Sequence, residues 1–282
     1  MASSSIASSS QAARAAAFSQ LHAGPGIFVI PNPWDAGSAK VLANMGFKAL
    51  ATTSAGMSFS IGKPDGDGVV TREEALANVR TIAAATSLPL SADLENGYGD
   101  DPAYCAQTIL MAAEAGAVGG SIEDATGRED DPIYSFELSV QRVRAAVEAA
   151  RSLPFPFTLT ARAENFLHGR QDLSDTIRRL TAFAEAGADV LFAPGLKTKE
   201  EITAAVKAVA PKPINVLSLG SLTIKELEEM GVRRISLGSI LARAAFGGLI
   251  RAAEEIRDKG SFSFSSTATP YAQLNELFRT GS

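Results

Sequence analysis

The sequence predicts a single (β/α)8 barrel, in which eight parallel strands are enclosed by helices. Three observations predict it: eight short apolar runs, helix-like segments between them, and a length of 282 residues, which a barrel of about 250 residues would nearly fill. Strands that alternate with helices pair in parallel, because each crossover returns the chain in the same direction. An open doubly wound sheet is the alternative, but GYGDDP keeps only the first two glycines of its nucleotide loop.

Each predicted strand is a short run of apolar and β-branched residues. The runs lie at residues 26–31, 48–54, 88–95, 118–125, 157–164, 188–195, 213–220 and 233–239. Between them, segments such as 101–117 and 174–189 repeat apolar residues at helical spacing, so that Leu180 and Phe183 share a face. Four joins, NMGFKAL, EAGAVGG, EAGADVL and EMGVRRI, place a glycine where the left-handed conformation would end a helix.

The chain divides into three predicted parts. Residues 1–25 form a leader and an N-terminal helix at about 11–22 that contains His22, residues 26–258 form the barrel, and residues 259–282 form a polar linker and an amphipathic helix. The first 21 residues are rich in Ser and Ala, with Arg14 as their only charged side chain. They lack the long apolar core of a secretory signal. A frayed tail is the favoured interpretation, and an organelle transit peptide is the alternative.

Composition excludes several classes of protein. A net charge of −5 without a Lys- or Arg-rich segment argues against a nucleic-acid-binding surface. Cys105 is the only cysteine, so an intramolecular disulfide is excluded and a reducing compartment is expected. No apolar stretch approaches the roughly 20 residues that span a bilayer. We therefore expect a cytoplasmic protein whose partner is a small molecule, with neither a nucleic acid nor a membrane as partner.

Polar residues gather where the predicted strands end, which is where barrel enzymes place their active sites. They are Thr53 and Ser54 after strand two, Asp93 and Glu95 after strand three, Glu123 and Asp124 after strand four, Arg162 and Glu164 after strand five, and Asn215 and Ser218 on strand seven. The chain has two histidines, His22 and His168, which excludes a His-rich metal centre. We expect His168 to lie in a surface loop, and Asp35 to cap the helix that follows strand one.

Three of these acids, Asp93, Glu95 and Glu123, are candidate ligands of one Mg²⁺ ion. Mg²⁺ prefers oxygen ligands in an octahedral shell and keeps several waters, so direct and water-bridged contacts are both open. The spacing of Asp93 and Glu95 would place them on one face of a strand. The alternative is that these acids are solvated or paired with Arg and Lys at the rim, and D-x-E alone is a weak signal.

Arg162 and the segment after strand two are candidate substrate ligands. A guanidinium suits a carboxylate, which it holds with two hydrogen bonds; a structural ion pair with Glu164 or a neighbouring acid is the alternative. The small residues of ATTSAGMSFSIGKPDGDG form a predicted loop whose N–H groups could bind an oxyanion. Asp65, within that segment, could equally be a turn former.

The motifs PNPWDAGSA, TTSAGMSFSIGKPDG, SADLENGYG, SIEDATG, TARAEN and NVLSLG, in this order, resemble the isocitrate lyase and phosphoenolpyruvate mutase superfamily. The resemblance spans most of the chain and implies a barrel that depends on Mg²⁺, or on Mn²⁺, and acts on 2-oxo acids or their enols. It implies these roles: Asp93, Glu95 and Glu123 near the metal, Asp65 and Glu123 in catalysis, Arg162 clamping the substrate, Ser54, Ala55 and Gly56 (with Thr53 in contention) holding its carboxylate, and Asn215 lining the pocket.

Departures from the family pattern narrow the expected reaction. The loop after strand four, EDATGREDDPIYSFEL, has no cysteine, lysine or histidine, and Gly195 stands where lyases of the family commonly carry glutamate. We therefore expect a lyase without the catalytic-cysteine loop. It would act on a small 2-oxo or 2-hydroxy dicarboxylate through a metal-stabilised enolate, as an oxaloacetate decarboxylase or another carbon–carbon lyase. The alternatives are a carbon–phosphorus mutase or hydrolase acting on phosphonopyruvate or phosphoenolpyruvate, and a non-catalytic barrel that binds an oxo acid.

The resemblance also implies an assembly. Family members exchange a C-terminal helix between subunits, so a homodimer or homotetramer with swapped helices is expected. The alternative is a C-terminal helix that packs on its own barrel.

Overall fold

Eight parallel strands form the centre of the computed structural model, which describes residues 10–66, 68–218 and 220–280. They pair in the order β1-β8-β7-β6-β5-β4-β3-β2, and the Ala51 N–H donates to the Pro31 carbonyl at 3.1 Å, which nearly closes the ring. The strands are β1 (Phe28–Ile30), β2 (Leu50–Ala51), β3 (Leu90–Asp93), β4 (Gly119–Glu123), β5 (Thr158–Arg162), β6 (Val190–Phe192), β7 (Ile214–Leu217) and β8 (Arg234–Ser236). The predicted (β/α)8 barrel is confirmed, with each strand shorter than its apolar run.

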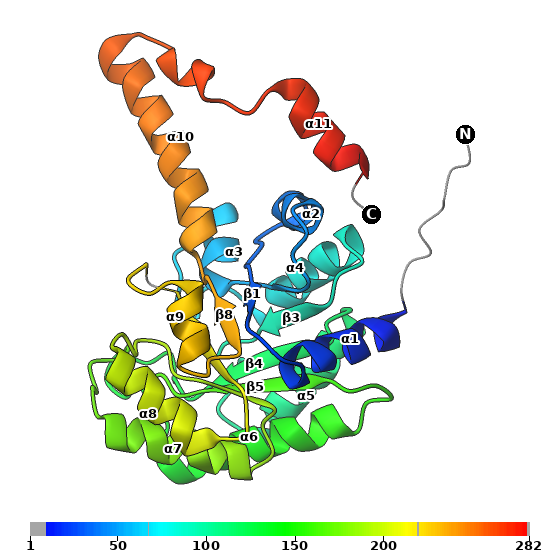
Figure 1. The fold of residues 1–282 in the computed structure, drawn as a ribbon, viewed down its shortest axis with the longest axis vertical. Coiled ribbons are helices and arrows are strands. Elements are labelled where there is room, and N and C mark those ends of the chain that lie inside the picture. Colours follow the sequence, from blue (N-terminus) through cyan, green and yellow to red (C-terminus); the bar gives the residue numbers. More distant parts are fainter. Residues whose placement is uncertain (1–9, 67, 219, 281–282) are drawn as a thin grey trace.

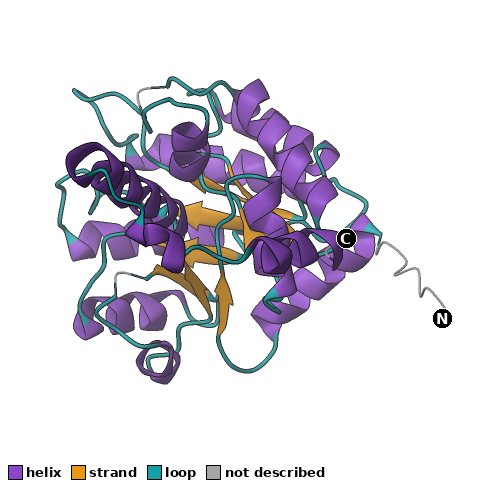
Figure 2. Cartoon of the chain, turned by 90° about the horizontal axis from the view of Figure 1, so that it is seen from above, coloured by secondary structure: helices purple, strands orange, loops and turns teal. Residues whose placement is uncertain are grey.

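Helices surround the strands, as the view from above shows (Figure 2). They are α2 (Ala36–Asn44), α3 (Ser54–Ser60), α4 (Arg72–Ala85), α5 (Pro102–Glu114), α6 (Phe136–Arg151), α7 (Leu173–Glu185), α8 (Lys199–Val209) and α9 (Ile224–Glu229), whereas α10 (Ile240–Lys259) extends away from the barrel (Figure 1). The predicted cap is confirmed, because the Asp35 carboxylate accepts the Ser38 N–H at 2.7 Å. The four predicted glycine stops are confirmed too, since Gly46, Gly116, Gly187 and Gly231 all have positive φ.

Helix α1 (Gln11–Ala23) closes the N-terminal end of the barrel. Its Ala15 and Phe18 are fully buried against Ile30, Ala49 and Val118, which project from the strands or lie beside them. Gly119 makes room for this contact, because a Cβ there would lie 2.7 Å from the Phe18 ring. The predicted helix is confirmed, and its last turn carries His22. Residues 1–9, with much of the stretch for which a transit peptide was the alternative, lie outside the described residues.

The segment after β2 differs from the prediction, because residues 54–60 form helix α3 and not a loop. The helix begins where the Thr53 side chain accepts the Gly56 N–H at 3.3 Å. It is held there by Met57, which packs with Val70, Ala75 and Tyr98. The residues of this helix are small and show no apolar periodicity, so the sequence did not predict it. Its stability comes from these distant contacts.

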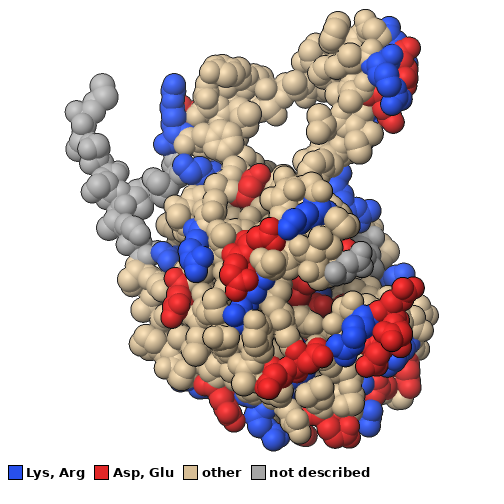
Figure 3. All heavy atoms as spheres, turned by 180° about the vertical axis from the view of Figure 1, so that it is seen from behind, with Lys and Arg blue, Asp and Glu red and all other residues tan. Residues whose placement is uncertain are grey.

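Helix α10, a short 3-10 turn (Ser263–Ser266) and α11 (Tyr271–Thr280) form a C-terminal arm. The arm leaves the barrel at the end of β8 and returns to α2, where the Asn44 amide donates to the Leu277 carbonyl at 2.6 Å. Figures 1 and 3 show open space between the arm and the barrel. Leu249, Ile250 and Phe262 are exposed on it. Among the described residues, no helix combines the length and the apolar character that a membrane span needs.

Candidate active site

The carboxyl ends of the strands open into two adjoining cavities. The larger, of about 640 Å³, is lined by Glu95, Tyr98, Glu123 and the loops after β2, β3, β4 and β5. The smaller, of about 260 Å³, extends from the same region into the barrel interior. Ser54, Asp65 and Arg162 line both. The predicted site residues therefore meet at the end of the barrel where they were expected.

Arg162 is held by three carboxylates. Its Nη1 lies 2.8 Å from Asp93, its Nη2 lies 3.0 Å from Glu123, and its Nε lies 2.9 Å from Glu164. Burial alone would lower the pKa of Arg162, but Glu123, Glu164 and Asp93 raise it well above its usual value. The structural ion pair that sequence analysis kept as the alternative is thus present, and the clamping of a substrate by Arg162 stays a prediction.

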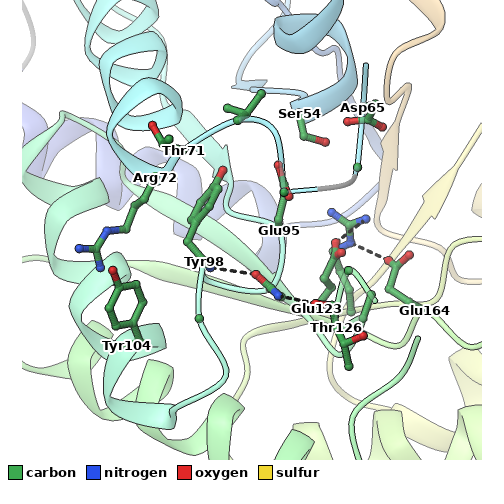
Figure 4. Close-up of a pocket in the computed structure, with 18 of the residues that line it drawn as sticks. Ser54, Asp65, Thr71, Arg72, Glu95, Tyr98, Tyr104, Glu123, Thr126 and Glu164 are labelled. Atoms are coloured by element: carbon green, nitrogen blue, oxygen red, sulfur yellow. Dashed lines mark hydrogen bonds and ion pairs between the residues drawn. The ribbon is translucent and has the colours of Figure 1, made fainter. Parts of the chain in front are cut away.

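Asp65 and Glu95 lie beside Asp93 in the acidic cluster, and among the described residues neither of the two forms an ion pair. The close-up shows Asp65, Glu95 and Glu123 directed toward the same space (Figure 4). Burial, and then repulsion from Asp93 and Asp65, raise the pKa of Glu95 to about 7. Burial and Asp93 likewise raise the pKa of Asp65 above its usual value. Carboxylates that repel one another in this way are stabilised by a cation.

The strand-face argument for Asp93 and Glu95 was wrong, although the two acids do face one space. Strand β3 ends at Asp93, and Glu95 follows in a left-handed conformation with φ of 47°. Tyr98 shares this feature, with φ of 64°. Such conformations cost about 1–3 kcal/mol in a residue other than glycine and persist where the surroundings impose them. Here the Arg142 guanidinium imposes them, because it donates to the carbonyls of Asn96, Gly99 and Asp100.

The donor set fits a hard divalent cation in its chemistry. All the candidate ligands are carboxylate oxygens, which Mg²⁺ and Mn²⁺ accept, and the cluster's repulsion would be relieved by binding. Within the described ranges, no three Asp, Glu, His or Cys side chains are arranged to hold a metal ion directly. Mg²⁺ commonly uses one or two carboxylates and completes its shell with water and substrate oxygens. Asp93, Glu95 and Asp65 are the side chains that could hold it, although Asp93, like Glu123, is paired with Arg162.

The N-terminus of α3 supplies the predicted amide groups. The Ser54 N–H donates to the Asp93 carboxylate at 3.2 Å, and the Gly56 N–H donates to the Thr53 side chain. In the described part of the chain the Ala55 N–H has no hydrogen-bond partner, and Ala55 lines the smaller cavity. First-turn amides of a helix carry partial positive charge and attract anions. Of the predicted amides, that of Ala55 is the one available to a ligand.

Asn215 lines the smaller cavity, as predicted, but both ends of its amide are engaged. Its Oδ1 accepts from Arg234 Nε at 2.8 Å, and its Nδ2 donates to Ser236 Oγ at 2.9 Å. Arg234, Tyr98 and Ser121 also line the cavities, and sequence analysis missed them. The signal for Arg234 was an arginine at an alternating position within a strand, RRISLG. His168 is exposed at the rim of the larger cavity, which agrees with its predicted place in a loop.

The loop after β4 is tied down on both sides. Asp124 lies 3.0 Å from Arg179 of α7, and both side chains are buried. Tyr134 donates to Asp100 at 2.5 Å, and Ala125 pairs with Ile133. Burial raises the pKa of Asp124 to about 6, against the effect of Arg179. This loop therefore lines the larger cavity as a fixed wall through Ala125, Thr126 and Gly127.

Comparisons with known proteins show which proteins this chain resembles. The family model for phosphoenolpyruvate phosphomutase matches residues 18–257. A Burkholderia cenocepacia protein provisionally named a lyase/mutase is 57% identical, with a TM-score of 0.92 over 95% of this chain and 96% of that one. Oxaloacetate acetylhydrolase, solved with its product oxalate, is 29% identical, with a TM-score of 0.85 over 94% of each chain. The 2-methylisocitrate lyase of Salmonella typhimurium is 30% identical, over 79% of this chain and 76% of its own.

Proposed function

We propose, from the premise that this chain belongs to the phosphoenolpyruvate phosphomutase family of the isocitrate lyase/PEP mutase superfamily, that it is a Mg²⁺-dependent lyase. Its substrate is a small 2-oxo or 2-hydroxy dicarboxylate. The observation that carries the proposal is the acidic cluster of Asp65, Asp93 and Glu95 beside Arg162, at the mouth of a cavity of about 640 Å³. The relatives named for oxaloacetate and 2,3-dimethylmalate, both of them dicarboxylates, support this substrate class.

Groups with positive charge in this site would bind the substrate, and the carboxylates would bind the metal ion. The free Ala55 N–H and the positive end of α3 hold one carboxylate of the substrate. Arg162 neutralises and orients the developing negative charge, once the substrate replaces one of its carboxylate partners. A bound Mg²⁺ would supply Lewis-acid polarisation of the 2-oxo group, which is worth several kcal/mol when a bond to C3 breaks and an enolate forms. Asp93, Glu95 and Asp65 hold that cation.

Two features favour carbon–carbon over carbon–phosphorus chemistry. The wall after β4 offers Ala125, Thr126 and Gly127 to the cavity, and residues 124–136 contain no lysine or asparagine to meet a phosphoryl group. The one basic residue of that loop, Arg128, is paired with Asp100 at 2.9 Å. A phosphoryl group with two negative charges would therefore find no unpaired cation in the described loop after β4.

The test is a screen of oxaloacetate, substituted malates, citrate-like acids and phosphonopyruvate with Mg²⁺. We expect a keto or carboxylic acid product from at least one carbon acid, and loss of its formation in EDTA. Asp93→Asn should lower kcat/KM by at least about 100-fold, the effect of several kcal/mol. Asp130→Asn, which removes an exposed charge from the loop after β4, is the matched control. Turnover of phosphonopyruvate alone, followed by phosphorus NMR, would establish the alternative function.

The C-terminal arm supports assembly into a homodimer or homotetramer. Apolar side chains on α10 and beyond it are exposed, with Leu249 at 63% and Phe262 at 62%. A second copy of the chain would cover them, at a gain of about 25 cal/mol per Å² of apolar surface. Sedimentation equilibrium tests this assembly, and a monomer at micromolar concentration would contradict it.

A further inference from the structure

The interior of this barrel is hollow and polar at the level below the acidic cluster. In most barrels of this class, bulky branched side chains fill the interior in layers. Here Ser91, Ser121 and Ser236 project into it, and they line the smaller cavity of about 260 Å³. A single water molecule needs only about 10–15 Å³ of such volume. The chamber therefore has room for a group of several atoms.

Arg234 of β8 lies in this chamber with only 5% of its surface exposed. Its Nε donates to Asn215 Oδ1 at 2.8 Å, and its Nη2 donates to Thr160 Oγ1 at 3.0 Å. Its Nη1 lies 3.3 Å from His22 Nε2. A guanidinium has five N–H donors, so these three contacts leave one free donor on each terminal nitrogen.

The partners of Arg234 are all neutral. Asn215 and Thr160 carry no charge. The Nδ1 of His22 faces the Phe18 carbonyl at 2.8 Å and so must hold the ring proton, which leaves Nε2 as an acceptor for Arg234. Burial and Arg234 lower the pKa of His22 to about 3, which keeps the ring neutral. Burial lowers the pKa of Arg234 only to about 9, so it is charged at neutral pH.

A buried charge without a counter-charge is costly, by several kcal/mol per ion. Arg162 and Arg179 avoid this cost, because Arg162 faces three carboxylates and Arg179 faces two. The buried Arg142 donates to three main-chain carbonyls instead, whereas Arg234 keeps two donors free. Among the described residues, no carboxylate lies within ion-pair distance of Arg234. Around Arg234 the chamber thus contains a fixed positive charge, two free donors and the Ser236 hydroxyl, all of which suit a planar anion. The acids that line the same cavity, Asp65 and Asp93, belong to the cluster beside Arg162.

We propose that Arg234 binds the second carboxylate of the substrate, the one remote from the acidic cluster, and so makes this chain selective for dicarboxylates. The inference rests on the proposed function, because it assumes that the other end of the substrate lies at the mouth. Arg162 and Arg234 line the same cavity, so one small molecule can reach both ends of it. Ser236 adds a donor to the bound carboxylate, because its Oγ accepts from Asn215 and keeps its own proton. Asn215 is a positioning residue that fixes the guanidinium plane.

Two acids that differ only in this second carboxylate provide the test. We would measure the Kd of (S)-malate and of (S)-lactate by calorimetry in Mg²⁺. The malate preference is the Kd of lactate divided by the Kd of malate. The native protein should prefer malate by at least 10-fold. Arg234→Gln should lower that ratio by about 10- to 100-fold, the value of a charged hydrogen bond. Arg234→Lys should keep part of it. A ratio unchanged in Arg234→Gln overturns the proposal.

A second pair of variants guards against failure of Arg234→Gln to fold. Ser236→Asp places the missing negative charge inside the chamber, and Ser236→Asn is the control of matched size without charge. We expect Ser236→Asp to fold with a raised Tm and to prefer malate at least 10-fold less than Ser236→Asn, which lacks the same hydroxyl but carries no charge. Equal ratios in the two variants would contradict a role for charge in the chamber.

These measurements separate the two proposals. A malate preference that depends on Arg234, in a protein with no turnover of any acid in the screen, would keep the carboxylate subsite and reject the lyase. If the protein turns over a dicarboxylate and its malate preference is the same in Arg234→Gln, the lyase proposal is supported and the carboxylate subsite at Arg234 is rejected.

Discussion

His22 couples the stability of the barrel to pH, because it sits neutral in the floor beneath Arg234. Its ring lies edge-on to Phe18 at 4.7 Å and to Phe28 at 5.1 Å between centroids. Burial, then the charge of Arg234 and finally that of Arg233 lower its pKa from 6.5 to about 3. A proton on this buried ring would face the charges of two guanidinium groups, so the folded chain disfavours it.

The sign and size of the effect follow from that shift. Above pH 6.5 the ring is neutral in the folded and unfolded chains, and it contributes nothing to the pH dependence. As the pH falls below 6.5, the unfolded chain gains a proton that the folded chain refuses, and each pH unit down to about 3 costs about 1.36 kcal/mol of stability. At pH 5 the loss from this one residue is therefore about 2 kcal/mol.

The assay is urea unfolding at pH 7.5 and at pH 5, with native protein, His22→Gln and His168→Gln. The glutamine at position 22 keeps an acceptor for Arg234 and a donor for the Phe18 carbonyl but does not titrate. We expect His22→Gln to reduce the loss of stability at pH 5 by about 2 kcal/mol. The exposed His168 is the matched control and should leave the loss unchanged. Equal losses in the native protein and in His22→Gln would refute the reasoning.

Three further predictions concern packing, the site loop and the arm. Gly119→Val should destabilise the fold by about 1–3 kcal/mol in urea unfolding, because its side chain meets the Phe18 ring and the Thr158 carbonyl, whereas Gly248→Val on exposed α10 should cost less. Arg142→Met should cost about 2–4 kcal/mol by the same measurement, since it leaves three loop carbonyls unbonded; no loss would show that they find other donors. Leu249→Glu on α10 should shift sedimentation toward monomer, and an unchanged assembly would place the interface elsewhere.

Elements whose signals are local could be predicted from the sequence. The eight strands, the glycine that ends each of four helices and the Asp35 cap all depend on residues within a few positions of one another. Helix α3 depends on Val70 and Ala75, which lie beyond the loop that follows it. Its own residues, SAGMSFS, carry no periodic signal, so tertiary packing determined the outcome.

In the candidate site, too, some features could be predicted from the sequence and others could not. The strand-end rule predicted that Asp93, Glu123 and Arg162 would meet, because parallel strands share one end. An ion pair of Arg162 with Glu164 or a neighbouring acid was the alternative interpretation of the sequence, but the rule could not predict that Arg162 would also bind Asp93, a residue 69 positions away. Arg234 was missed because its candidate role depends on the absence of a carboxylate partner among the described residues, which the sequence does not show. A strand arginine is ordinary at a surface, and only the barrel register shows that this one points inward without an acid.

The docking of α11 on α2 involves a surface that every copy of the chain carries. If two molecules exchange their arms, the hydrogen bond from Asn44 to Leu277 is lost within each chain and regained between them, so its energy cancels. The hinge of the arm then determines the equilibrium between molecules that dock α11 on their own α2 and molecules that exchange arms. This hinge begins at Gly260, which has φ of 60°, and ends at Pro270. Stiffening the hinge should change the proportion of exchanged molecules, whereas weakening the α11 contact should loosen both forms alike.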